Sequence, residues 1–517
     1  MSQTSTSFQA AIQAGYTFKG DDIVLGVAML DQEAVPDALV RIPLRTLNRH
    51  GLIAGATGSG KTKTLQILAE QFAAKGIPSL LMDIKGDLSG ISVAGESNEK
   101  IEERHRKIGI PFTPAGTTVE LLSLSREKGA RLRATVSEFG PVLFSKILGI
   151  NETQRGVLSV VFKFCEDQDL PLLDLEDLKK SLQYLTNEGK ELFRSSYGAI
   201  STATLGALMR KIVELEQQGA AAFFGEPSFE VDDLCRLDEN GRGIVSVVRL
   251  TDIQDRPKLF STFMLQLLAE IYAAFPEEGD QAQPRLAIFI DEAHLVFDEA
   301  TPALLDQLEA IVRLVRSKGV GIFFVTQNPA DIPEVILGQL GLKVQHALRA
   351  FTAKDRKSIQ LAAQNYPETP YYAVDQLITQ LGIGEAVVTA LNEKGIPTPL
   401  AHVLLRAPQS RMGVLDEAEI DRLVDKAALA AKYNRVIDRE SASEMLARKL
   451  ERARSEEHQA EMRRQQASGR PRRQEKSALE EVLSSPTTRQ IGRAVARELT
   501  RGLLGVLGLG TTSRRRR

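Results

Sequence analysis

Cysteine is scarce in this chain, and tryptophan is absent. Among 517 residues the only cysteines are Cys165 and Cys235, and no C-x-x-C pair occurs. Two cysteines so far apart argue against a disulfide framework and against a cysteine-based zinc site. So low a cysteine content is typical of a protein that works in a reducing cytosol.

Long hydrophobic runs are also missing. No apolar stretch approaches the roughly 18–20 residues that cross a bilayer. The N-terminus, residues 1–8, lacks the basic and apolar segments of a signal peptide. We therefore expect a cytoplasmic protein without a transmembrane segment.

The chain carries little net charge, with a formal value of −2. Its hydrophobic content of 43% and charged content of 26% are ordinary for a soluble globular protein. Basic residues gather at the extreme C-terminus, where residues 514–517 are all arginine. A chain of this length exceeds one ordinary hydrophobic core, which predicts two or more domains.

One glycine-rich stretch carries a specific motif. Residues 55–62 fit G-x-x-x-x-G-K-[ST] at every fixed position, between an apolar run at 51–54 and a helical pattern at 62–75. Glycines let successive backbone N–H groups turn inward at a helix N-terminus, where they bind phosphate. In this motif the lysine reaches the β- and γ-phosphates, and the last hydroxyl ligates Mg²⁺. The predicted nucleotide-binding residues are Gly55, Ala56, Thr57, Gly58, Ser59, Gly60, Lys61 and Thr62, with Thr62 also a ligand of Mg²⁺.

A second apolar strand at 77–83 follows the helix, and it ends in Asp83, with Lys85 and Asp87 close behind. Strand, helix and strand in this order form a βαβ unit of a parallel sheet. Ligands bind at the carboxyl ends of such strands. These three charged residues therefore belong either to the site or to an ordinary solvated turn, and the sequence leaves both open.

The order of predicted elements divides the chain into four parts. Residues 1–50 are a segment with a frayed start (1–15) and a short β-hairpin, and residues 51–94 and 240–408 form an α/β core with a mainly parallel sheet. The core closes in an edge hairpin at 384–391 and 399–405. Residues 95–239 are a mainly α-helical insertion. Residues 409–517 are a charged helical region with a basic, partly disordered tail.

A second pair of motifs supplies the chemistry that a phosphate loop lacks. The apolar strand 285–290 ends in Asp291 and Glu292. Asp291 would hold Mg²⁺ through its water shell, and Glu292 would orient and activate the attacking water. The next strand, 320–326, ends at Gln327, whose amide would hydrogen-bond the γ-phosphate or the water. His294 is expected to be a packing residue.

Together these motifs resemble the HerA–FtsK superfamily of hexameric DNA-pumping ATPases, and within it the bacterial HerA-like helicase branch. The resemblance extends over roughly residues 16–410, and its motifs follow in the order of the family: 48–62, 83–90, 133–141, 291–294, 316–321, 325–329 and 348–355. It implies a RecA-like P-loop NTPase core, a hexameric ring, ATP bound between neighbouring subunits, and DNA as the partner.

The resemblance also assigns roles to arginines that spacing alone does not. Arg316 matches an arginine that the family places near the nucleotide of its own subunit. Arg49 or Arg349 would act from the neighbouring subunit. HerA translocases also carry an N-terminal β-barrel that docks nucleases, whereas only about 50 residues precede the loop here. A nuclease partner is therefore left open.

Two functions follow from these predictions. The first is an ATP-driven DNA translocase or helicase, and the alternative is a RecA-fold ATPase that acts on a protein partner or assembly without nucleic acid. The core lacks interleaved aromatic and basic residues. A basic stripe recurs near the C-terminus at Arg489, Arg493, Arg497 and Arg501. Such a helix could contact DNA phosphates, an anionic membrane surface or a partner protein.

Overall fold

The computed structural model describes residues 3–452 and 455, apart from 126, 255, 280, 298–301, 436, 438 and 439. These residues form two compact units. The sheet unit comprises the described residues of 1–133, 218–223 and 227–436, and the helical unit those of 134–217, 224–226 and 437–455. The basic C-terminal stripe and the tetra-arginine end lie outside the described residues.

One twelve-stranded sheet organises the described part of the sheet unit, in the order β2-β1-β12-β11-β10-β3-β9-β8-β4-β7-β5-β6. From β10 to β6 neighbouring strands are parallel, and from β10 to β2 they are antiparallel. The strands are β1 (Asp22–Leu30), β2 (Glu33–Pro43), β3 (Gly51–Ala54), β4 (Ser79–Asp83), β5 (Val119–Ser123), β6 (Ala130–Arg131), β7 (Val245–Arg249), β8 (Leu286–Ile290), β9 (Val320–Thr326), β10 (Leu342–Gln345), β11 (Glu385–Thr389) and β12 (Ala401–Leu405). The predicted mainly parallel sheet is confirmed.

The central strands are apolar because both faces of the sheet are covered. Every residue of β3, β4, β8 and β9 is buried. Continuous apolar runs of this kind are typical of parallel strands with helices on both sides. The aromatic rings of Phe289 and Phe323 stack with centroids 4.8 Å apart, and Phe72 packs against both of them. This cluster ties the helix after the glycine-rich loop to the middle of the sheet.

The first residues differ from the expected frayed start. They form helix α1 (Gln3–Gly15), in which Phe8 and Ile12 are fully buried. The ring of Phe8 meets Tyr371 edge-on at 5.0 Å, and the Tyr16 hydroxyl donates to the Pro399 carbonyl at 2.7 Å. The prediction was wrong because polar residues on the outer face of this helix hide the two apolar anchors on its inner face.

The N-terminal hairpin also changes the edge of the sheet. Strands β1 and β2 pair antiparallel, as predicted, and β1 then pairs with β12. The β11–β12 hairpin therefore lies inside the sheet, and the expected edge position is wrong. The edge is formed by β2, whose strand contains Pro36, a residue tolerated at sheet edges.

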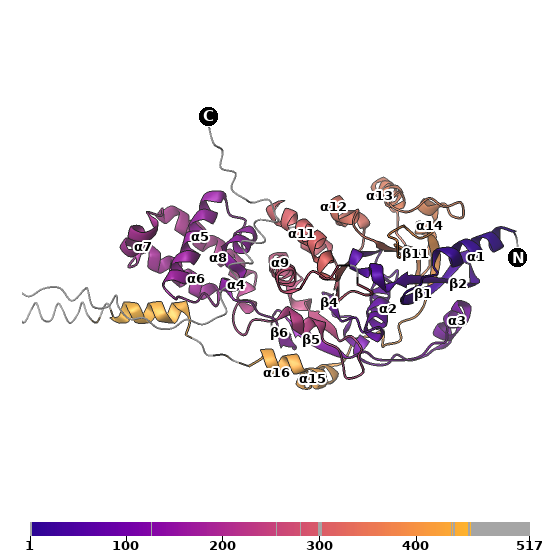
Figure 1. Cartoon of the computed structure of the whole chain (residues 1–517), viewed down its shortest axis with the longest axis horizontal. Helices are drawn as coiled ribbons and strands as arrows, with labels where there is room; N and C mark the ends of the chain where they lie inside the picture. The colour runs from indigo at the N-terminus through magenta and orange to yellow at the C-terminus, as the bar shows by residue number, and fades with distance from the viewer. Residues whose placement is uncertain are drawn as a thin grey trace, which may run out of the picture. The chain divides into compact units, whose positions relative to one another are not determined.

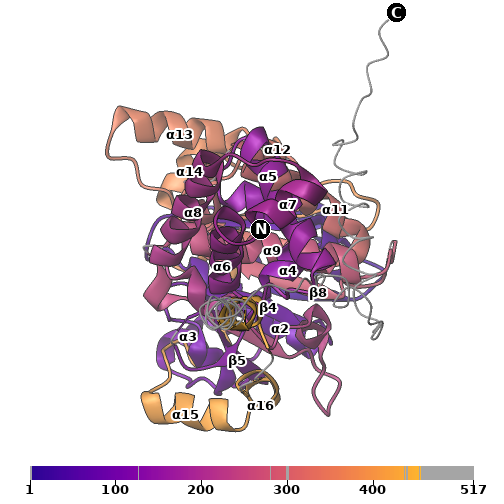
Figure 2. The ribbon, with the colours of Figure 1, turned by 90° about the vertical axis from the view of Figure 1, so that its left-hand side faces the viewer.

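Helices cover both faces of the sheet in this unit. In both views α12, α13 and α14 lie on the opposite side from α3, α15 and α16 (Figures 1 and 2). The described helices are α2 (Lys61–Ala74), α3 (Glu99–Ile108), α9 (Pro257–Ala274), α10 (His294–Phe297), α11 (Pro302–Val315), α12 (Glu334–Leu337), α13 (Ala353–Ala363), α14 (Val374–Gln380), α15 (Glu417–Asp425) and α16 (Ala428–Tyr433). Two short 3₁₀ turns, η1 (Leu44–Arg49) and η6 (Arg316–Lys318), precede β3 and β9.

The helical unit is built from α4 (Val136–Ile147), α5 (Glu152–Asp167), α6 (Leu175–Thr186), α7 (Lys190–Tyr197) and α8 (Thr202–Gln217). Three of these helices begin with capping boxes, at Thr135, Asn151 and Asp174. Such caps satisfy the free N–H groups of the first turn. The unit is shorter than the expected insertion of residues 95–239, because β5 and β6 belong to the sheet.

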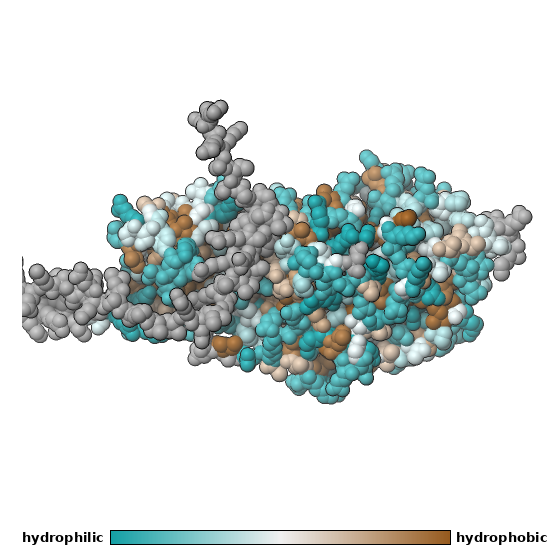
Figure 3. Space-filling view, viewed as in Figure 1, coloured by the Kyte–Doolittle hydropathy of each residue, from teal (hydrophilic) through white to brown (hydrophobic). Residues whose placement is uncertain are grey.

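Among the described residues, no helix is both long and apolar enough to cross a membrane. Over the face drawn in Figure 3, hydrophobic residues are scattered among hydrophilic ones. Isolated exposed apolar side chains of this kind are normal on folded proteins.

Candidate nucleotide site

The glycine-rich loop joins β3 to α2, at the carboxyl edge of the parallel strands. Its three glycines have φ angles of +154°, +77° and +116° at Gly55, Gly58 and Gly60. A Cβ atom at Gly55 would lie 2.5 Å from the Cβ atom of His346, so a side chain there has no room. Gly60 is the N-cap of α2 and has no side chain to satisfy the N–H groups of the first turn. The loop therefore presents backbone donors to an anion.

Neighbouring strands hold the loop in place. The N–H of Gly55 donates to the Thr326 carbonyl at 3.2 Å, and the N–H of Ala56 donates to the Ala347 carbonyl at 2.7 Å. Inside the loop, the Ser59 hydroxyl donates to the Ala56 carbonyl at 2.6 Å. The loop is thus built on the ends of β9 and β10 as well as β3.

The side chain of Lys61 is folded into the loop. Its ammonium donates to the carbonyls of Gly55 at 2.6 Å and Ala56 at 3.2 Å. Burial lowers the pKa of Lys61, and the nearby charge of Lys85 lowers it further, whereas Glu292 and Asp291 oppose the shift. Two lysines and two carboxylates therefore share this part of the site.

The register of the sheet explains how the predicted residues converge. Ala54 pairs with Thr326, Phe324 pairs with Ile290, and Ile290 pairs with Met82. The ends of β3, β9, β8 and β4 therefore lie side by side. The loop, Gln327, the Asp-Glu pair and Asp83 follow these four strand ends, in that order across the sheet.

Asp291 is buried at the end of β8, with 1% of its surface exposed. Its Oδ2 atom has no hydrogen-bond partner among the described residues. Burial raises the pKa of this carboxyl to about 6, even though Lys85 favours the charged form. A buried oxygen acceptor without a partner is costly, which favours a ligand for it.

Glu292 follows with φ of +46°, which is uncommon for a residue with a side chain. Its carboxylate forms an ion pair with Lys85 through Oε1 and lies 3.3 Å from the Nδ1 atom of His294 through Oε2. Burial raises the pKa of Glu292, but Lys85, His294 and Lys61 lower it more, so the net pKa is below its usual value. His294, expected only to pack, thus contacts the carboxylate.

Gln327 extends from the end of β9 and is exposed. Its Oε1 atom lies 3.5 Å from the Thr57 hydroxyl of the loop. The chain turns immediately afterwards, because the Asp331 carboxylate accepts hydrogen bonds from the Thr326 hydroxyl at 2.5 Å and the Asn328 N–H at 3.1 Å. The backbone that carries Gln327 is therefore held beside the loop.

The sequence left open whether the charged residues after β4 belong to the site or to an ordinary turn. In the structure Asp83 and Lys85 differ in this respect. Asp83 is structural, since its carboxylate accepts hydrogen bonds from the N–H groups of Gly86 at 2.8 Å, Asp87 at 3.1 Å and Leu88 at 3.1 Å. Burial raises the pKa of Asp83 to about 7, against the effect of these donors. Lys85, which projects from the same turn, belongs to the site.

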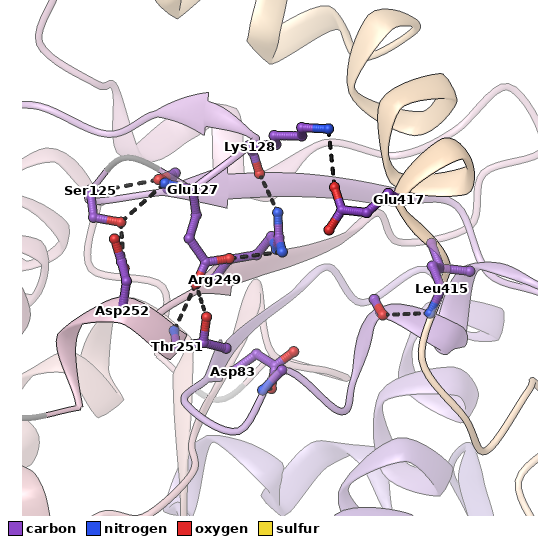
Figure 4. A network of polar contacts seen from close by, with 12 residues as sticks. Asp83, Ser125, Glu127, Lys128, Arg249, Thr251, Asp252, Leu415 and Glu417 are labelled. Atoms are coloured by element: carbon purple, nitrogen blue, oxygen red, sulfur yellow. Dashed lines mark hydrogen bonds and ion pairs between the residues drawn. The ribbon is translucent and has the colours of Figure 1, made fainter.

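A polar network beside this turn had no sequence signal (Figure 4). Glu127 forms an ion pair with Arg249 at 2.8 Å and accepts a hydrogen bond from the Thr251 N–H at 2.9 Å. Arg249 also donates to the Lys128 carbonyl at 3.1 Å, and the Ser125 hydroxyl donates to Asp252 at 2.6 Å. The network joins the ends of β5 and β7, and β7 pairs with β4. It joins residues 125–128 to residues 249–252, which are over a hundred residues apart, so no local sequence pattern reveals it.

Two more residues supporting the loop were missed. His346, at the end of β10, is buried, and its Nε2 atom lies 2.8 Å from the Thr64 hydroxyl of α2. Arg104 on α3 donates to the carbonyls of Ile383, Gly384 and Leu405, each at 3.0 Å. The N–H of Gly384 in turn donates to the Ser59 carbonyl at 3.2 Å.

The predicted arginines do not all reach this edge. Arg349 follows β10, is exposed, and donates to the Thr379 carbonyl at 3.0 Å, so it lies on the same edge as the loop. Arg49 and Arg316 lie on η1 and η6, which precede β3 and β9 and hence lie at the opposite edge. Arg316 thus begins away from the loop of its own subunit, and its role toward a nucleotide stays a prediction.

These features define the class of protein. A mainly parallel sheet, a glycine-rich loop opening a helix, and an Asp-Glu pair on a nearby strand end make the chain a P-loop NTPase with a RecA-like fold. The family model described as Helicase HerA-like C-terminal matches residues 29–515. The chain belongs to this HerA-like family, as the motifs predicted.

Named relatives share the family at low identity. The chain is 24% identical over 357 residues to the DNA double-strand break repair helicase HerA of Sulfurisphaera tokodaii, covering 68% of this chain and 64% of that protein. It is 23% identical over 363 residues to the same-named protein of Sulfolobus acidocaldarius, covering 69% and 66%. The chain thus spans about two thirds of the length of these relatives.

Solved structures show the same fold. The bacterial conjugative coupling protein TrwBdeltaN70, in its unbound monoclinic form, matches with a TM-score of 0.52 at 15% identity, over 79% of this chain and 95% of that one. The plasmid coupling protein TrwB in complex with the ATP analogue ADPNP matches with a TM-score of 0.51 at 16% identity, over 78% and 94%.

Proposed function

We propose that this protein is an ATP-hydrolysing ring motor that moves on DNA. One observation carries the hydrolytic part of this proposal. The glycine-rich loop, Gln327 and the Asp291–Glu292 pair follow adjacent strand ends at a single edge of the sheet. That combination suits phosphoanhydride hydrolysis, which needs a phosphate cradle, a metal-holding carboxylate and a base for water.

The residues present fit a nucleotide with Mg²⁺. The loop offers backbone N–H donors and Lys61 to phosphates. The free Oδ2 atom of Asp291 and the hydroxyl of Thr62 are oxygen donors of the hard kind that Mg²⁺ prefers. Bound Mg²⁺ would withdraw charge from the phosphate oxygens. The TrwB structure with the ATP analogue ADPNP supports ATP as the nucleotide.

Each side chain then has a chemical task. Lys61 leaves its loop carbonyls to neutralise phosphate charge, because a phosphate oxygen is a stronger acceptor than a carbonyl. Glu292 stays ionised at neutral pH and accepts a proton from the attacking water. Gln327 donates from its amide to the γ-phosphate or the water, which makes it sensitive to which nucleotide is bound.

The arginines favour a ring in which ATP lies between subunits. Arg49 and Arg316 lie at the edge of the sheet away from their own loop, which supports a role at the site of a neighbour. Arg349 lies on the edge of its own loop and is exposed. A charge supplied in trans stabilises the transition state of phosphoryl transfer. We therefore assign the arginine finger to Arg49 or Arg316, in a hexameric ring.

DNA as the substrate rests on the family and its named relatives, which are DNA repair helicases. A motor that tracks duplex DNA contacts phosphates, so its stimulation by DNA depends steeply on salt. The competing function is an ATPase that acts on a protein partner or assembly without nucleic acid.

The decisive experiment measures ATP turnover of the full chain with and without duplex DNA, from about 50 to 200 mM salt. We expect stimulation by DNA that disappears as salt rises. Turnover that duplex DNA leaves unchanged at low salt would refute the DNA motor and favour the protein-directed ATPase.

Lys61→Ala should abolish nucleotide binding, whereas Glu292→Gln should bind ATP without hydrolysing it. Continued turnover by Glu292→Gln would show that the base is assigned wrongly.

Mixing experiments test the ring. Subunits carrying Arg49→Ala or Arg316→Ala are mixed with Glu292→Gln subunits, and particle size is measured on the same samples. We expect the mixtures to lose or gain activity in a non-linear way, since one site needs residues from two subunits. Activity that follows simple dilution would contradict a finger in trans.

A further inference from the structure

The turn that carries Lys85 is rigid. Besides the three N–H groups bound by Asp83, the Asp83 carbonyl accepts a hydrogen bond from the Leu250 N–H at 3.0 Å. The Gln254 amide donates to the Ile84 carbonyl at 2.6 Å. A turn held from both sides fixes the direction in which the side chain of Lys85 leaves the backbone.

That direction points the ammonium of Lys85 at Glu292. The two form an ion pair in which the Glu292 side chain is 8% exposed and the Lys85 side chain 37%. An exposed ion pair contributes little, but a carboxylate that is nearly buried depends on its partner. Lys61, by contrast, donates to carbonyls of its own loop. The two lysines of the site thus have different tasks.

The backbone conformation of Glu292 is strained, so contacts of its side chain must help to hold the residue in place. Its φ of +46° is a conformation that costs of order 1 kcal/mol for a residue other than glycine. Strained residues persist where the surroundings over-determine their position. Lys85 pairs with Oε1, whereas Oε2 lies 3.3 Å from the Nδ1 atom of His294 and has no hydrogen-bond partner among the described residues. Each oxygen keeps a further lone pair for water.

We propose that Lys85 is a positioning residue that holds the carboxylate of Glu292 in the orientation needed to activate water. This inference rests on the proposed hydrolysis of ATP and adds a residue for which no motif supplies a role. Lys85 acts through Glu292, so its loss should impair the chemical step and leave nucleotide binding nearly intact.

The test uses the full chain and the Lys85→Met variant, which keeps the apolar stem and removes the charge. We expect kcat to fall on the order of 10²-fold, as for a misoriented catalytic group, with KM and the affinity for ATP changing less than about threefold. Lys85→Arg should recover part of kcat. Lys75→Met is the matched control, because Lys75 is equally exposed, at 38%, and pairs with Asp21 at 3.5 Å away from the site.

Two further readouts separate positioning from other roles. In a Glu292→Gln background, Lys85→Met should cause no additional loss, since the group that it positions is already disabled. Hydrogen exchange of a peptide covering residues 290–297, measured without nucleotide, should be faster in Lys85→Met than in the wild type. If Lys85→Met does not fold, Lys85→Gln takes its place in both measurements.

The outcomes are distinct. An unchanged kcat in Lys85→Met, a raised KM with normal kcat, or an equal loss in the Glu292→Gln background would each overturn the positioning role. A wild-type protein that binds ATP but never hydrolyses it would refute the proposed function, and this inference with it. Wild-type hydrolysis that is indifferent to Lys85 would refute the inference alone.

Discussion

Replacing His50 by asparagine should remove a large part of the acid sensitivity of the sheet unit. His50 is 2% exposed and lies between η1 and β3. Its Nδ1 atom accepts a hydrogen bond from the Ile322 N–H at 3.0 Å, so the proton lies on Nε2, which donates to the Val312 carbonyl at 2.9 Å. A second proton on Nδ1 would meet the Ile322 N–H head-on. Burial, above all, lowers the pKa of His50 to about 4, and the charge of Arg316 adds to the shift.

The lowered pKa of His50 sets the direction and the size of the expected change in folding stability with pH. An unfolded chain binds a proton at His50 below about pH 6.5, whereas the folded chain does not until about pH 4. The contribution of neutral His50 is therefore complete above pH 6.5 and is lost as the pH falls. At about 1.4 kcal/mol per pH unit the full loss is about 3 kcal/mol, of which about 2 kcal/mol is already gone at pH 5.

Asparagine is the suitable substitution because it keeps a side-chain acceptor and does not titrate, and both residues would hold the same backbone conformation, with φ of 58° and ψ of 172°. Its side-chain oxygen can accept the Ile322 N–H, but it cannot reach the Val312 carbonyl. At pH 8 His50→Asn should therefore cost about 1 kcal/mol for the lost hydrogen bond. Between pH 8 and pH 5 the variant should lose about 2 kcal/mol less than the wild type, since asparagine does not titrate.

The assay is hydrogen exchange in increasing urea, read on peptides that cover β3 and β9, at pH 8 and pH 5. Exchange of these peptides reports the opening of this region without requiring the whole chain to unfold in one step. If the wild type and His50→Asn lose the same stability between pH 8 and pH 5, within about 0.5 kcal/mol, the reasoning is refuted.

Three further predictions concern packing, capping and loop support. Phe72→Ala should destabilise the sheet unit by about 3–5 kcal/mol by leaving a cavity in the aromatic cluster, seen as a lower urea midpoint; a loss under 1 kcal/mol would contradict the packing. Asn98→Ala should cost about 1 kcal/mol, because its side chain caps α3 by accepting from the Ile101 N–H; hydrogen exchange of α3 should rise, and unchanged exchange would dismiss the cap. Arg104→Met should loosen the Gly384 carbonyl next to the loop and raise KM for ATP more than it lowers kcat. A variant in which kcat falls more than KM rises would show that Arg104 does not act by supporting the loop.

The candidate phosphate loop could be predicted from sequence because its pattern is local. The motif needs glycine at two positions, lysine at one and serine or threonine at one within eight consecutive residues, and strand and helix patterns flank them. Asp291 and Glu292 followed from an apolar strand that ends in carboxylates. The parallel register then brings these separate strand ends to one edge.

Residues that act through distant partners could not be predicted. Lys85 appeared only as one charge in a polar turn, since its contact with Glu292 joins segments more than two hundred residues apart. The place of Arg316 in the fold is a second example. A motif order assigns residues to a site but does not say which subunit contributes them, whereas the direction of β9 puts Arg316 at the far edge.

Two of the places where the chain passes from one unit to the other, at residues 133–134 and 226–227, lie side by side. The Phe229 N–H donates to the Arg133 carbonyl at 2.9 Å in the sheet unit, and the Gly225 N–H donates to the Ala134 carbonyl at 3.1 Å in the helical unit. The ends of the segment 134–226 are therefore close together, and the entropic cost of closing such a segment rises only slowly with its length. Residues can therefore be added within the helices of this segment at little entropic cost, while the strand ends that bear the candidate nucleotide site keep their register.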